Sequence, residues 1–243
     1  MSDNWLTARV VQNRHWTDAL FSLRVEGAAL GFEAGQFVRI ALDIDGERVA
    51  RPFSFVNPPR DPTLEFYGIV VPEGPLSPRL ARLVPGDILH VARNPAGFLV
   101  LSELPDAESL WLMATGTGIA PFLSILRTEA PWKRFRNIIL VHAVRHAAEL
   151  VYRETIQQMQ NLRYVTFVSR ESAPQALAGR IPAAIADGRL EAAAGLRLAA
   201  ETSQVMLCGN PDMLKDTSAA LMARGLRKHR RRAPGQISVE SFW

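Results

Sequence analysis

The chain has 243 residues, of which 48% are hydrophobic and 21% charged, and its formal net charge is +4. This length and composition predict a folded protein with room for two hydrophobic cores and exclude a disordered chain. A single cysteine excludes an intrachain disulfide and an iron–sulfur cluster held by the chain's own thiolates. No apolar run approaches the roughly 18 to 20 residues that a membrane-spanning helix requires, so no membrane partner is expected.

Two terminal segments bear on location and partners. Met1–Trp5 has neither the basic part nor the apolar part of a secretory signal peptide, so we expect a cytoplasmic protein. Arg227–Arg232 is a basic run, which either attracts phosphates or an acidic protein or is a solvated helix end and loop. Because no nucleic-acid recognition motif accompanies the run, we do not expect a nucleic-acid partner.

The first hundred residues are predicted to be mostly β-strands. Asp45-Gly46 is a strong hairpin signal, and a short helix is expected with Ser77 as its N-cap and Pro78 in its first position. Six strands in about ninety residues predict a closed antiparallel barrel or sandwich. Short runs rich in Val, Ile, Leu and Phe mark these strands, at 8–15, 19–26, 36–43, 48–56, 64–71 and 88–93.

The pattern changes to alternating strands and helices from residue 110 onward. Strands that are apolar on both faces and separated by helices predict a parallel α/β sheet. Pro, Asp and Ser cluster at 102–108, so the predicted domains are 1–103 and 104–243. The expected strands are 110–114, 138–141, 164–168 and 205–207, and the expected helices are 122–128, 149–159, 181–186 and 212–224.

A glycine-rich turn, Gly116-Thr-Gly-Ile-Ala-Pro121, follows the first strand of this second half. Ligands bind α/β sheets at the carboxyl ends of strands, where glycines admit a diphosphate and a helix N-terminus favours its charge. A tight turn without a ligand is the alternative. Pro121 replaces the third glycine of the common dinucleotide fingerprint, and no Gly-Lys-Ser/Thr follows, which argues against a P-loop NTPase.

Arginines follow the next strands of the predicted sheet. Arg145 ends one strand, Ser169 and Arg170 end the next, and Arg180 follows ten residues later. At such places an acidic residue holds the ribose hydroxyls of NAD, whereas an arginine favours the 2′-phosphate of NADP. Guanidinium groups and a hydroxyl together suit a phosphate. The sequence therefore favours NADP.

Three further features have two interpretations each. His142 and His146 have the spacing of helical metal ligands, but a strand end at His142 would put them on different faces, so no metal site is predicted. Cys208 ends an apolar strand, where it is either a small buried hydrophobe or part of a functional motif. The terminal aromatics Phe242 and Trp243 either end an edge strand or stack on a planar cofactor.

Three motifs in fixed order carry a family resemblance: Arg51-Pro-Phe-Ser54, Gly116–Phe122 and Cys208-Gly-Asn-Pro-Asp-Met213. Nearly end to end, the chain resembles a bacterial ferredoxin (or flavodoxin)–NADP reductase of the plant-type superfamily. The resemblance implies an N-terminal antiparallel β-barrel that binds FAD and a C-terminal parallel α/β domain that binds NADP(H). It also implies hydride transfer between NADP(H) and FAD and single-electron transfer to ferredoxin or flavodoxin.

The same resemblance implies roles for individual residues. The residues that orient the stacked rings and stabilise the reduced flavin would be Ser54, Cys208 and Glu240. The FAD contacts would be Arg51, Pro52, Phe53, Ser54, Tyr67, Leu76, Ser77, Thr117, Phe242 and Trp243. The NADP contacts would be Gly116, Gly118, Arg145, Ser169, Arg170, Arg180, Gly209, Asn210 and Asp212. Phe53 and Phe242 stand where the family has tyrosine, so ring stacking is kept and each hydroxyl is lost.

Two other functions fit these residues. One is a free flavin reductase, or the reductase component of an oxygenase that lacks its iron–sulfur domain. The other is a basic binding module that has the fold but binds no FAD. Ferredoxins and flavodoxins are acidic, which suits electrostatic steering toward a basic protein. We expect a monomer whose electron acceptor is a separate protein.

Overall fold

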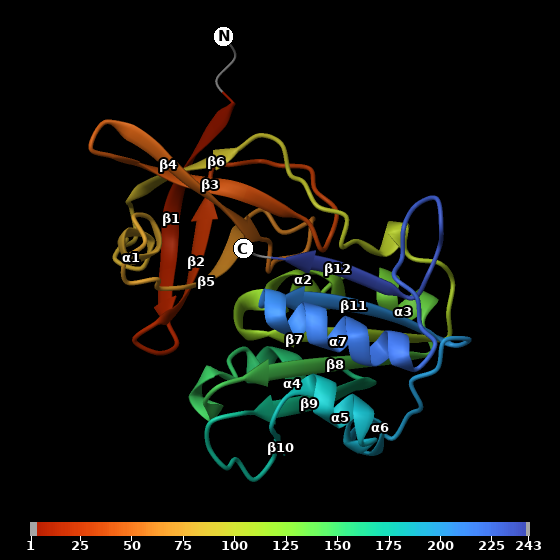
Figure 1. Cartoon of the computed structure of the whole chain (residues 1–243). Helices are drawn as coiled ribbons and strands as arrows, with labels where there is room; N and C mark the ends of the chain where they lie inside the picture. Colours follow the sequence, from red (N-terminus) through yellow and green to blue (C-terminus); the bar gives the residue numbers. More distant parts are fainter. Residues whose placement is uncertain (1–3, 242–243) are drawn as a thin grey trace. The chain divides into compact units, whose positions relative to one another are not determined.

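The computed structural model describes residues 4–241 and divides into two compact units, each with a hydrophobic core of its own (Figure 1). The first unit contains the residues up to Val100 together with Ala120–Thr128. The second contains Leu101–Ile119 and the residues from Glu129 onward. The helix α2 (Ala120–Leu126) therefore groups with the first unit, and the domain boundary between residues 103 and 104 stays a prediction.

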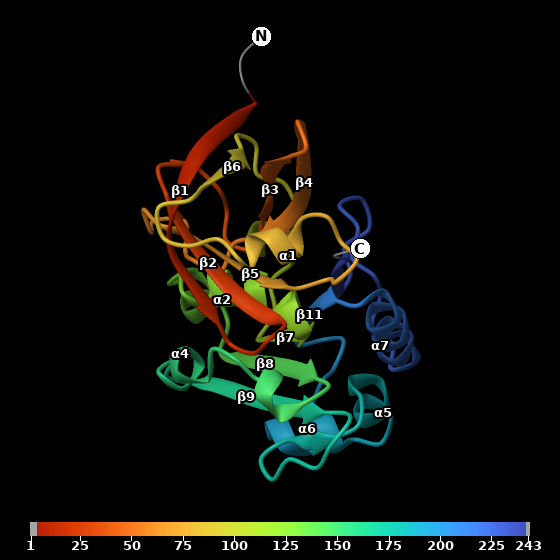
Figure 2. The ribbon, with the colours of Figure 1, turned by 90° about the vertical axis from the view of Figure 1, so that its left-hand side faces the viewer.

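The first unit is an antiparallel sheet of six strands in the order β4-β3-β6-β1-β2-β5 (Figure 2). The edge strands β4 and β5 meet at a bridge between Phe55 and Phe66, and Val56 N donates to Glu65 O at 2.9 Å. The sheet thus curls into the predicted barrel. Its strands are β1 (Trp5–His15), β2 (Leu20–Glu26), β3 (Phe37–Ile44), β4 (Glu47–Ser54), β5 (Leu64–Ile69) and β6 (Ile88–Ala92).

Of the two local features predicted in this unit, the hairpin turn is confirmed and the helix N-cap is wrong. Asp45 and Gly46 have φ of 52° and 84° and connect β3 to β4 as a tight hairpin turn, as expected. The short helix α1 spans Ser77–Leu80, with Leu76 as its N-cap, so the prediction that Ser77 is the N-cap is wrong. The Ser77 hydroxyl accepts from Val71 N at 2.9 Å instead, which fixes the preceding loop.

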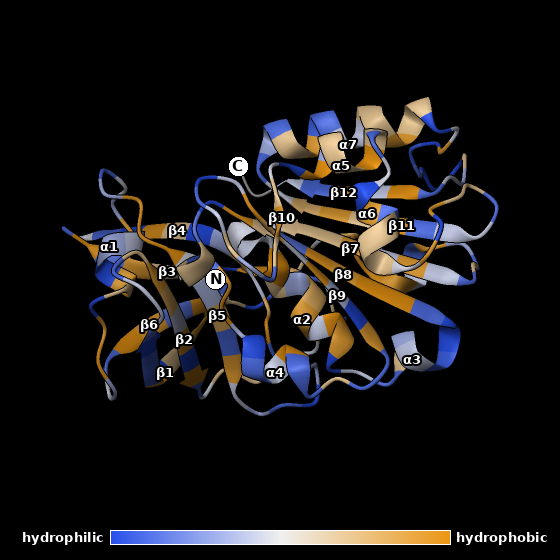
Figure 3. Ribbon diagram, turned by 90° about the horizontal axis from the view of Figure 1, so that it is seen from below, coloured by the Kyte–Doolittle hydropathy of each residue, from blue (hydrophilic) through white to orange (hydrophobic). Residues whose placement is uncertain are grey.

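The second unit is a sheet of six strands in the order β10-β9-β8-β7-β11-β12, and every paired strand is parallel. Apolar residues of α5, α6 and α7 form one core with Trp111, Ile139 and Phe167 of the sheet (Figure 3). The strands are β7 (Ser109–Thr115), β8 (Asn137–Val144), β9 (Leu162–Val168), β10 (Leu177–Ala178), β11 (Ser203–Gly209) and β12 (Ile237–Ser241). The helices are α3 (Ala130–Arg134), α4 (Arg153–Gln157), α5 (Ile181–Ala186), α6 (Arg189–Ala194) and α7 (Pro211–Ala223), with 3-10 turns η1 (Leu101–Glu103), η2 (Gly116–Ile119) and η3 (Ala147–Glu149).

The helix predicted at 149–159 is the main difference from expectation. Tyr152 has φ of 59°, a left-handed conformation that interrupts a helix, so the chain forms η3 and then the short α4. The sequence also gave no signal for α3 and α6, which are too short for a clear period. Within residues 4–241, no helix combines the length and the apolar character needed to cross a membrane.

Candidate functional site

The nucleotide-site residues predicted in the second unit all lie at the carboxyl ends of parallel strands. Because such ends meet at one edge of a sheet, the topology gathers residues from five separate segments. Gly116 and Gly118 follow β7, Arg145 follows β8, Ser169 and Arg170 follow β9, Arg180 follows β10, Gly209 ends β11, and Asn210 and Asp212 follow it.

The turn η2 packs backbone to backbone against the end of β11. A Cβ atom at Gly118 would overlap the Cys208 carbonyl oxygen, and one at Gly209 (φ 139°) would overlap Thr115 Oγ1. Gly116 (φ 52°) has open space where its Cβ would be. The turn therefore presents bare backbone on its open side, which fits the close approach of a nucleotide diphosphate.

Cys208 is fully buried in the middle of this arrangement. It pairs in register with Ala114 of β7 on one side and Glu240 of β12 on the other. Burial raises the pKa of the Cys208 thiol well above its usual value, and the nearby Glu240 charge raises it further. The thiol is thus protonated at neutral pH, which argues against a nucleophilic role, and its part in ring alignment stays a prediction.

Asn210 forms the N-cap of α7. Its Oδ1 accepts from Asp212 N at 2.9 Å and from Met213 N at 3.3 Å, and its own N donates to Thr115 Oγ1 at 3.0 Å. Asp212 is exposed in the first turn, where the helix dipole favours its charge. These bonds fix the loop between β11 and α7, while contacts of either residue with NADP stay predictions.

His142 is a site residue whose role the sequence did not reveal. It is fully buried, with Nε2 3.1 Å from Gly116 O and Nδ1 3.4 Å from the Tyr164 hydroxyl. Burial lowers the pKa of His142 to about 4, although the bond to Gly116 acts in the opposite direction. A neutral imidazole therefore donates to Gly116 O and accepts from Tyr164. Because a trans peptide points its C=O and N–H in opposite directions, this bond turns the Thr117 N–H away from His142.

His142 is consequently a structural donor to the glycine turn. His146 is exposed and contacts Glu171. In the part of the chain that the structure describes, no three His, Cys, Asp or Glu side chains form a cluster suited to a metal ion.

The predicted arginines are all exposed and are linked through their backbones. Arg170 N donates to Arg145 O at 3.0 Å, and Ser169 N donates to Val144 O at 3.1 Å. Within residues 4–241, the guanidinium groups of Arg145, Arg170 and Arg180 make no hydrogen bond or ion pair. Three unpaired cations at the ends of adjacent strands fit a phosphate group.

The first unit carries the residues predicted for FAD on strand faces. Ser54 ends β4 and is buried, and its Oγ has no hydrogen-bond partner among the described residues. Phe53 is half-buried and lies edge-on to Phe66, with ring centroids 6.4 Å apart. A Cβ at Gly68 would lie 2.9 Å from the Phe53 ring, so the glycine leaves room for this ring. An unpartnered buried hydroxyl beside an aromatic ring fits a polar, planar cofactor such as a flavin.

The remaining FAD residues differ in exposure. Arg51 and Pro52 are exposed, and Arg51 Nη1 donates to Ala50 O at 2.8 Å. Tyr67 and Leu76 are buried. Thr117 lies half-buried in η2, and Glu240 lies half-buried in β12. Phe242 and Trp243 lie outside the described residues. The contacts of Arg51, Pro52, Tyr67, Leu76, Thr117, Phe242 and Trp243 with FAD stay predictions, as does the role of Glu240 in orienting the stacked rings.

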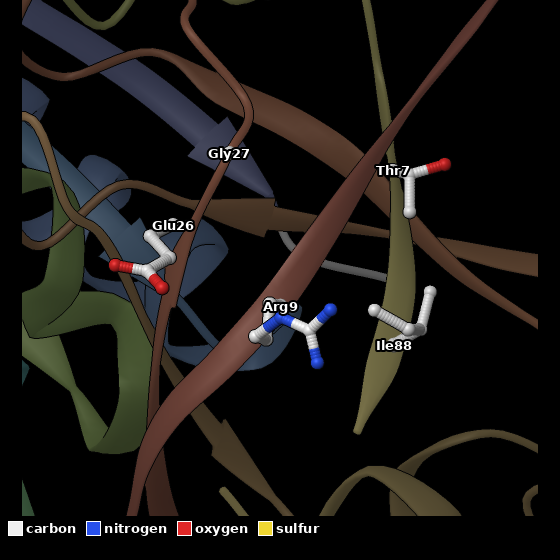
Figure 4. Close-up of a pocket in the computed structure, with 5 residues that line it drawn as sticks. All are labelled: Thr7, Arg9, Glu26, Gly27 and Ile88. Carbon is white, nitrogen blue, oxygen red and sulfur yellow. The ribbon is translucent and has the colours of Figure 1, made fainter. Parts of the chain in front are cut away.

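A surface hollow on the first unit is separate from all these residues. It is lined by Thr7, Arg9, Glu26, Gly27 and Ile88, which come from β1, the end of β2 and β6 (Figure 4). Arg9 is engaged there, because its Nη1 donates to Gly86 O at 2.9 Å. The hollow contains none of the predicted site residues and is not assigned to the cofactors.

Comparisons with known proteins agree with this division of residues. The family described as oxidoreductase FAD-binding domain matches residues 6–99, and the oxidoreductase NAD-binding domain matches residues 112–219. A flavodoxin/ferredoxin–NADP reductase of Shigella flexneri is 52% identical over 99% of both chains. A ferredoxin–NADP reductase of Pseudomonas aeruginosa is 38% identical over 98% of this chain and 97% of its own.

A solved structure shows the same similarity in three dimensions. The ferredoxin NADP⁺ reductase of Neisseria gonorrhoeae, with bound FAD and NADP, covers 100% of both chains with a TM-score of 0.96 and 32% identity. The similarity thus spans both units and includes a relative that binds the two cofactors to which these residues are suited. The chain belongs to the flavodoxin/ferredoxin–NADP reductase family of FAD-dependent oxidoreductases.

Proposed function

We propose that this chain transfers electrons between NADP(H) and a ferredoxin or flavodoxin, with FAD held by the first unit and NADP(H) at the carboxyl edge of the second unit's sheet. The observation that carries the proposal is the set of unpaired arginines Arg145, Arg170 and Arg180 at the same edge as the open glycine turn. This combination suits a nucleotide with an additional phosphate on its ribose.

The first-unit residues bind and orient FAD. FAD held by these residues would supply the chemistry that connects a two-electron hydride donor, NADPH, to a one-electron carrier. Arg51, exposed on β4, neutralises the diphosphate, and Phe53 packs on the flavin ring. The Ser54 hydroxyl donates a hydrogen bond to the flavin and so gains the partner that it lacks among the described residues.

The second-unit residues bind and align NADP(H). The arginines neutralise the 2′-phosphate, and the backbone of η2 with the N-terminus of α7 receives the diphosphate. Cys208 and Glu240 occupy adjacent positions on β11 and β12 and set the orientation of the nicotinamide. Because alignment affects the transition state more than ground-state binding, their main effect is on the rate of hydride transfer.

The electron carrier is an acidic protein that approaches a chain of net charge +4. We do not assign its docking to Arg227–Arg232, because this run precedes the amino end of β12, and the nucleotide residues lie at the carboxyl edge. Within the run, Arg231 already pairs with Glu103. We also propose that the enzyme works as a monomer in the cytoplasm.

An Arg170→Ala variant tests the proposed nucleotide. Charge-assisted hydrogen bonds contribute roughly 1.5–3 kcal/mol, so kcat/KM for NADPH should fall about ten- to a hundredfold. The value for NADH should change little, because NADH lacks the 2′-phosphate. Arg136→Ala is the matched control, since Arg136 is an exposed arginine just before the amino end of β8. Equal losses with both nucleotides would refute the assignment.

A further inference from the structure

Two carboxylates hold the segment that follows β8. Glu149 Oε2 accepts from Arg145 N at 2.9 Å and from His146 N at 3.3 Å. Glu171 Oε1 accepts from Ala147 N at 2.6 Å, and its Oε2 lies 3.2 Å from His146 Nδ1. Residues 145–147 are therefore fixed from both sides by side chains of η3 and of the loop after β9.

These carboxylates are close in sequence to Arg145 and Arg170, two of the arginines proposed to bind the 2′-phosphate. Glu171 follows Arg170 directly, and Glu149 is four residues after Arg145. Nevertheless, within residues 4–241 neither carboxylate forms an ion pair with either arginine. Instead, Glu149 Oε2 and both carboxylate oxygens of Glu171 are bonded to backbone N–H groups and to His146, and both guanidinium groups stay available.

The backbone that carries the phosphate-binding arginines depends on residues 145–147. Arg170 N donates to Arg145 O at 3.0 Å, so the loop after β9 is attached to the same residue whose N–H is bound by Glu149. The Ala147 N–H bond and His146 lower the pKa of Glu171, so this side chain is ionised at neutral pH. Glu171 is thus an anion within a site that is built to bind another anion.

We propose that Glu149 and Glu171 are specificity-determining positioning residues that hold Arg145 and Arg170 in place for the 2′-phosphate of NADP(H). The inference rests on the proposed function, because it assumes that these arginines bind that phosphate. Two effects of the carboxylates oppose each other. Their charges repel the phosphate, but this repulsion between exposed groups is screened by solvent and salt. Their hydrogen bonds to the backbone are charge-assisted and order the loop, which is the larger effect.

The two effects predict opposite results when Glu171 is removed. Loss of a negative charge alone would tighten NADP⁺ binding, whereas loss of the ordered loop weakens it. We expect Glu171→Ala in the FAD-loaded enzyme to raise the Kd of NADP⁺ about tenfold, the amount that one charge-assisted hydrogen bond supplies. The kcat/KM for NADPH should fall by the same factor by which the Kd of NADP⁺ rises, whereas the kcat/KM for NADH should barely change.

Matched variants separate positioning from charge. Glu171→Gln keeps an oxygen that accepts from Ala147 N, so it should recover most of the loss although the charge is gone. Glu154→Gln removes an exposed carboxylate of α4 that makes no side-chain hydrogen bond or ion pair within residues 4–241, and its Kd should stay within about twofold of the parent. Titration of NADP⁺ followed by flavin absorption gives the Kd values without turnover.

The outcomes distinguish this inference from the proposed function. If Glu171→Ala tightens NADP⁺ binding, leaves it unchanged or weakens NADPH and NADH alike, the positioning role is wrong. If Arg170→Ala in the same series lowers kcat/KM equally for NADPH and NADH, the proposed binding of the 2′-phosphate by these arginines is itself wrong. FAD content and melting temperature report any loss of folding. Should Glu171→Ala fail to fold, Glu149→Ala replaces it, because this variant removes the acceptor of Arg145 N and His146 N. Unchanged or tightened NADP⁺ binding in Glu149→Ala would then overturn the inference.

Discussion

The two units assemble their predicted site residues by different physical means. In the second unit, a parallel sheet brings the ends of β7, β8, β9, β10 and β11 to one edge, so residues far apart in sequence meet there. In the first unit, antiparallel strands end at alternate edges, and the predicted FAD residues lie along β4, β5 and the loop before α1. In a parallel sheet, the positions of the strand ends are therefore enough to locate a site from the sequence. In an antiparallel barrel, a sequence motif is needed to locate it.

The site residues of the two units also differ in whether their polar side chains have hydrogen-bond partners within the protein. At the carboxyl edge, Thr115, His142 and Asn210 bind backbone atoms of neighbouring loops. In the first unit, Ser54 is buried with an Oγ that has no partner among the described residues. We infer that the nucleotide site is formed by the fold itself and that the flavin site is completed by its cofactor.

The largest effect is expected from Gly118→Ala. The new Cβ would overlap the Cys208 carbonyl, so the backbone of η2 or β11 must shift, at a cost of about 3 kcal/mol in the free energy of unfolding. Gly116→Ala is the matched control, because its Cβ meets open space and only the left-handed φ of 52° adds strain, about 1 kcal/mol. Urea unfolding measures both. Equal costs would show that close packing of the turn is not what requires glycine.

An effect of similar size concerns the pH dependence of stability through His142. Its pKa is about 4 in the folded chain because of burial, below the unfolded value of about 6.5. The unfolded state therefore binds the proton more strongly between these values, so the stability present above pH 6.5 is lost as pH falls toward 4. The loss amounts to about 3 kcal/mol.

Urea unfolding from pH 7 to pH 4 measures this dependence. His142→Gln should flatten the curve, since the variant has no group to protonate at this position. The same slope in the His142 variant and the parent would contradict a buried neutral imidazole.

Cys208→Ser should have a kinetic effect of intermediate size. FAD stays bound, the Kd of NADP⁺ changes by a few fold, and flavin reduction slows by roughly tenfold, because the substitution alters alignment at the transition state. Stopped-flow absorbance reads the reduction rate. The buried thiol, with its raised pKa, should also resist alkylation at neutral pH in the folded protein. An unchanged reduction rate would leave Cys208 with a packing role only.

The smallest effect, and the most direct contrast with the second unit, is expected from Ser54→Ala. Removing a buried hydroxyl that lacks a partner should not destabilise the FAD-free protein. FAD binding should weaken by about three- to tenfold, because a hydrogen bond to the cofactor is lost. Thermal unfolding and FAD titration test the two parts. A destabilised FAD-free protein with normal FAD affinity would show that Ser54 serves the fold alone.

The sequence predicted those features whose signals are local. Asp45-Gly46 forms the expected turn, and α5 spans the expected residues, because turn chemistry and a proline at the helix start act over a few residues. The carboxyl-edge positions of Arg145 and Arg170 followed from strand ends.

Features that depend on tertiary partners were missed or wrong. The Ser77 hydroxyl binds the loop before α1, and the left-handed Tyr152 interrupts the helix expected at 149–159. The spacing of His142 and His146 led to no predicted metal site, and the contact of His142 with Gly116 O was missed because this carbonyl is twenty-six residues away in the chain. Sequence spacing does not indicate which backbone carbonyl a buried side chain will meet.

Anaerobic stopped-flow reduction of the FAD-loaded enzyme tests the central claim most directly, namely that NADPH bound through the arginine edge reduces the FAD. We predict that NADPH bleaches the flavin absorption rapidly, that NADH does so much less efficiently, and that adding oxidised flavodoxin or ferredoxin restores the absorption. In the Arg170→Ala variant NADPH should reduce the flavin more slowly. The difference between the reduction rates with NADPH and NADH should therefore become smaller. Failure of NADPH to bleach the flavin, or equal efficiency of NADPH and NADH in the parent enzyme, would contradict the account.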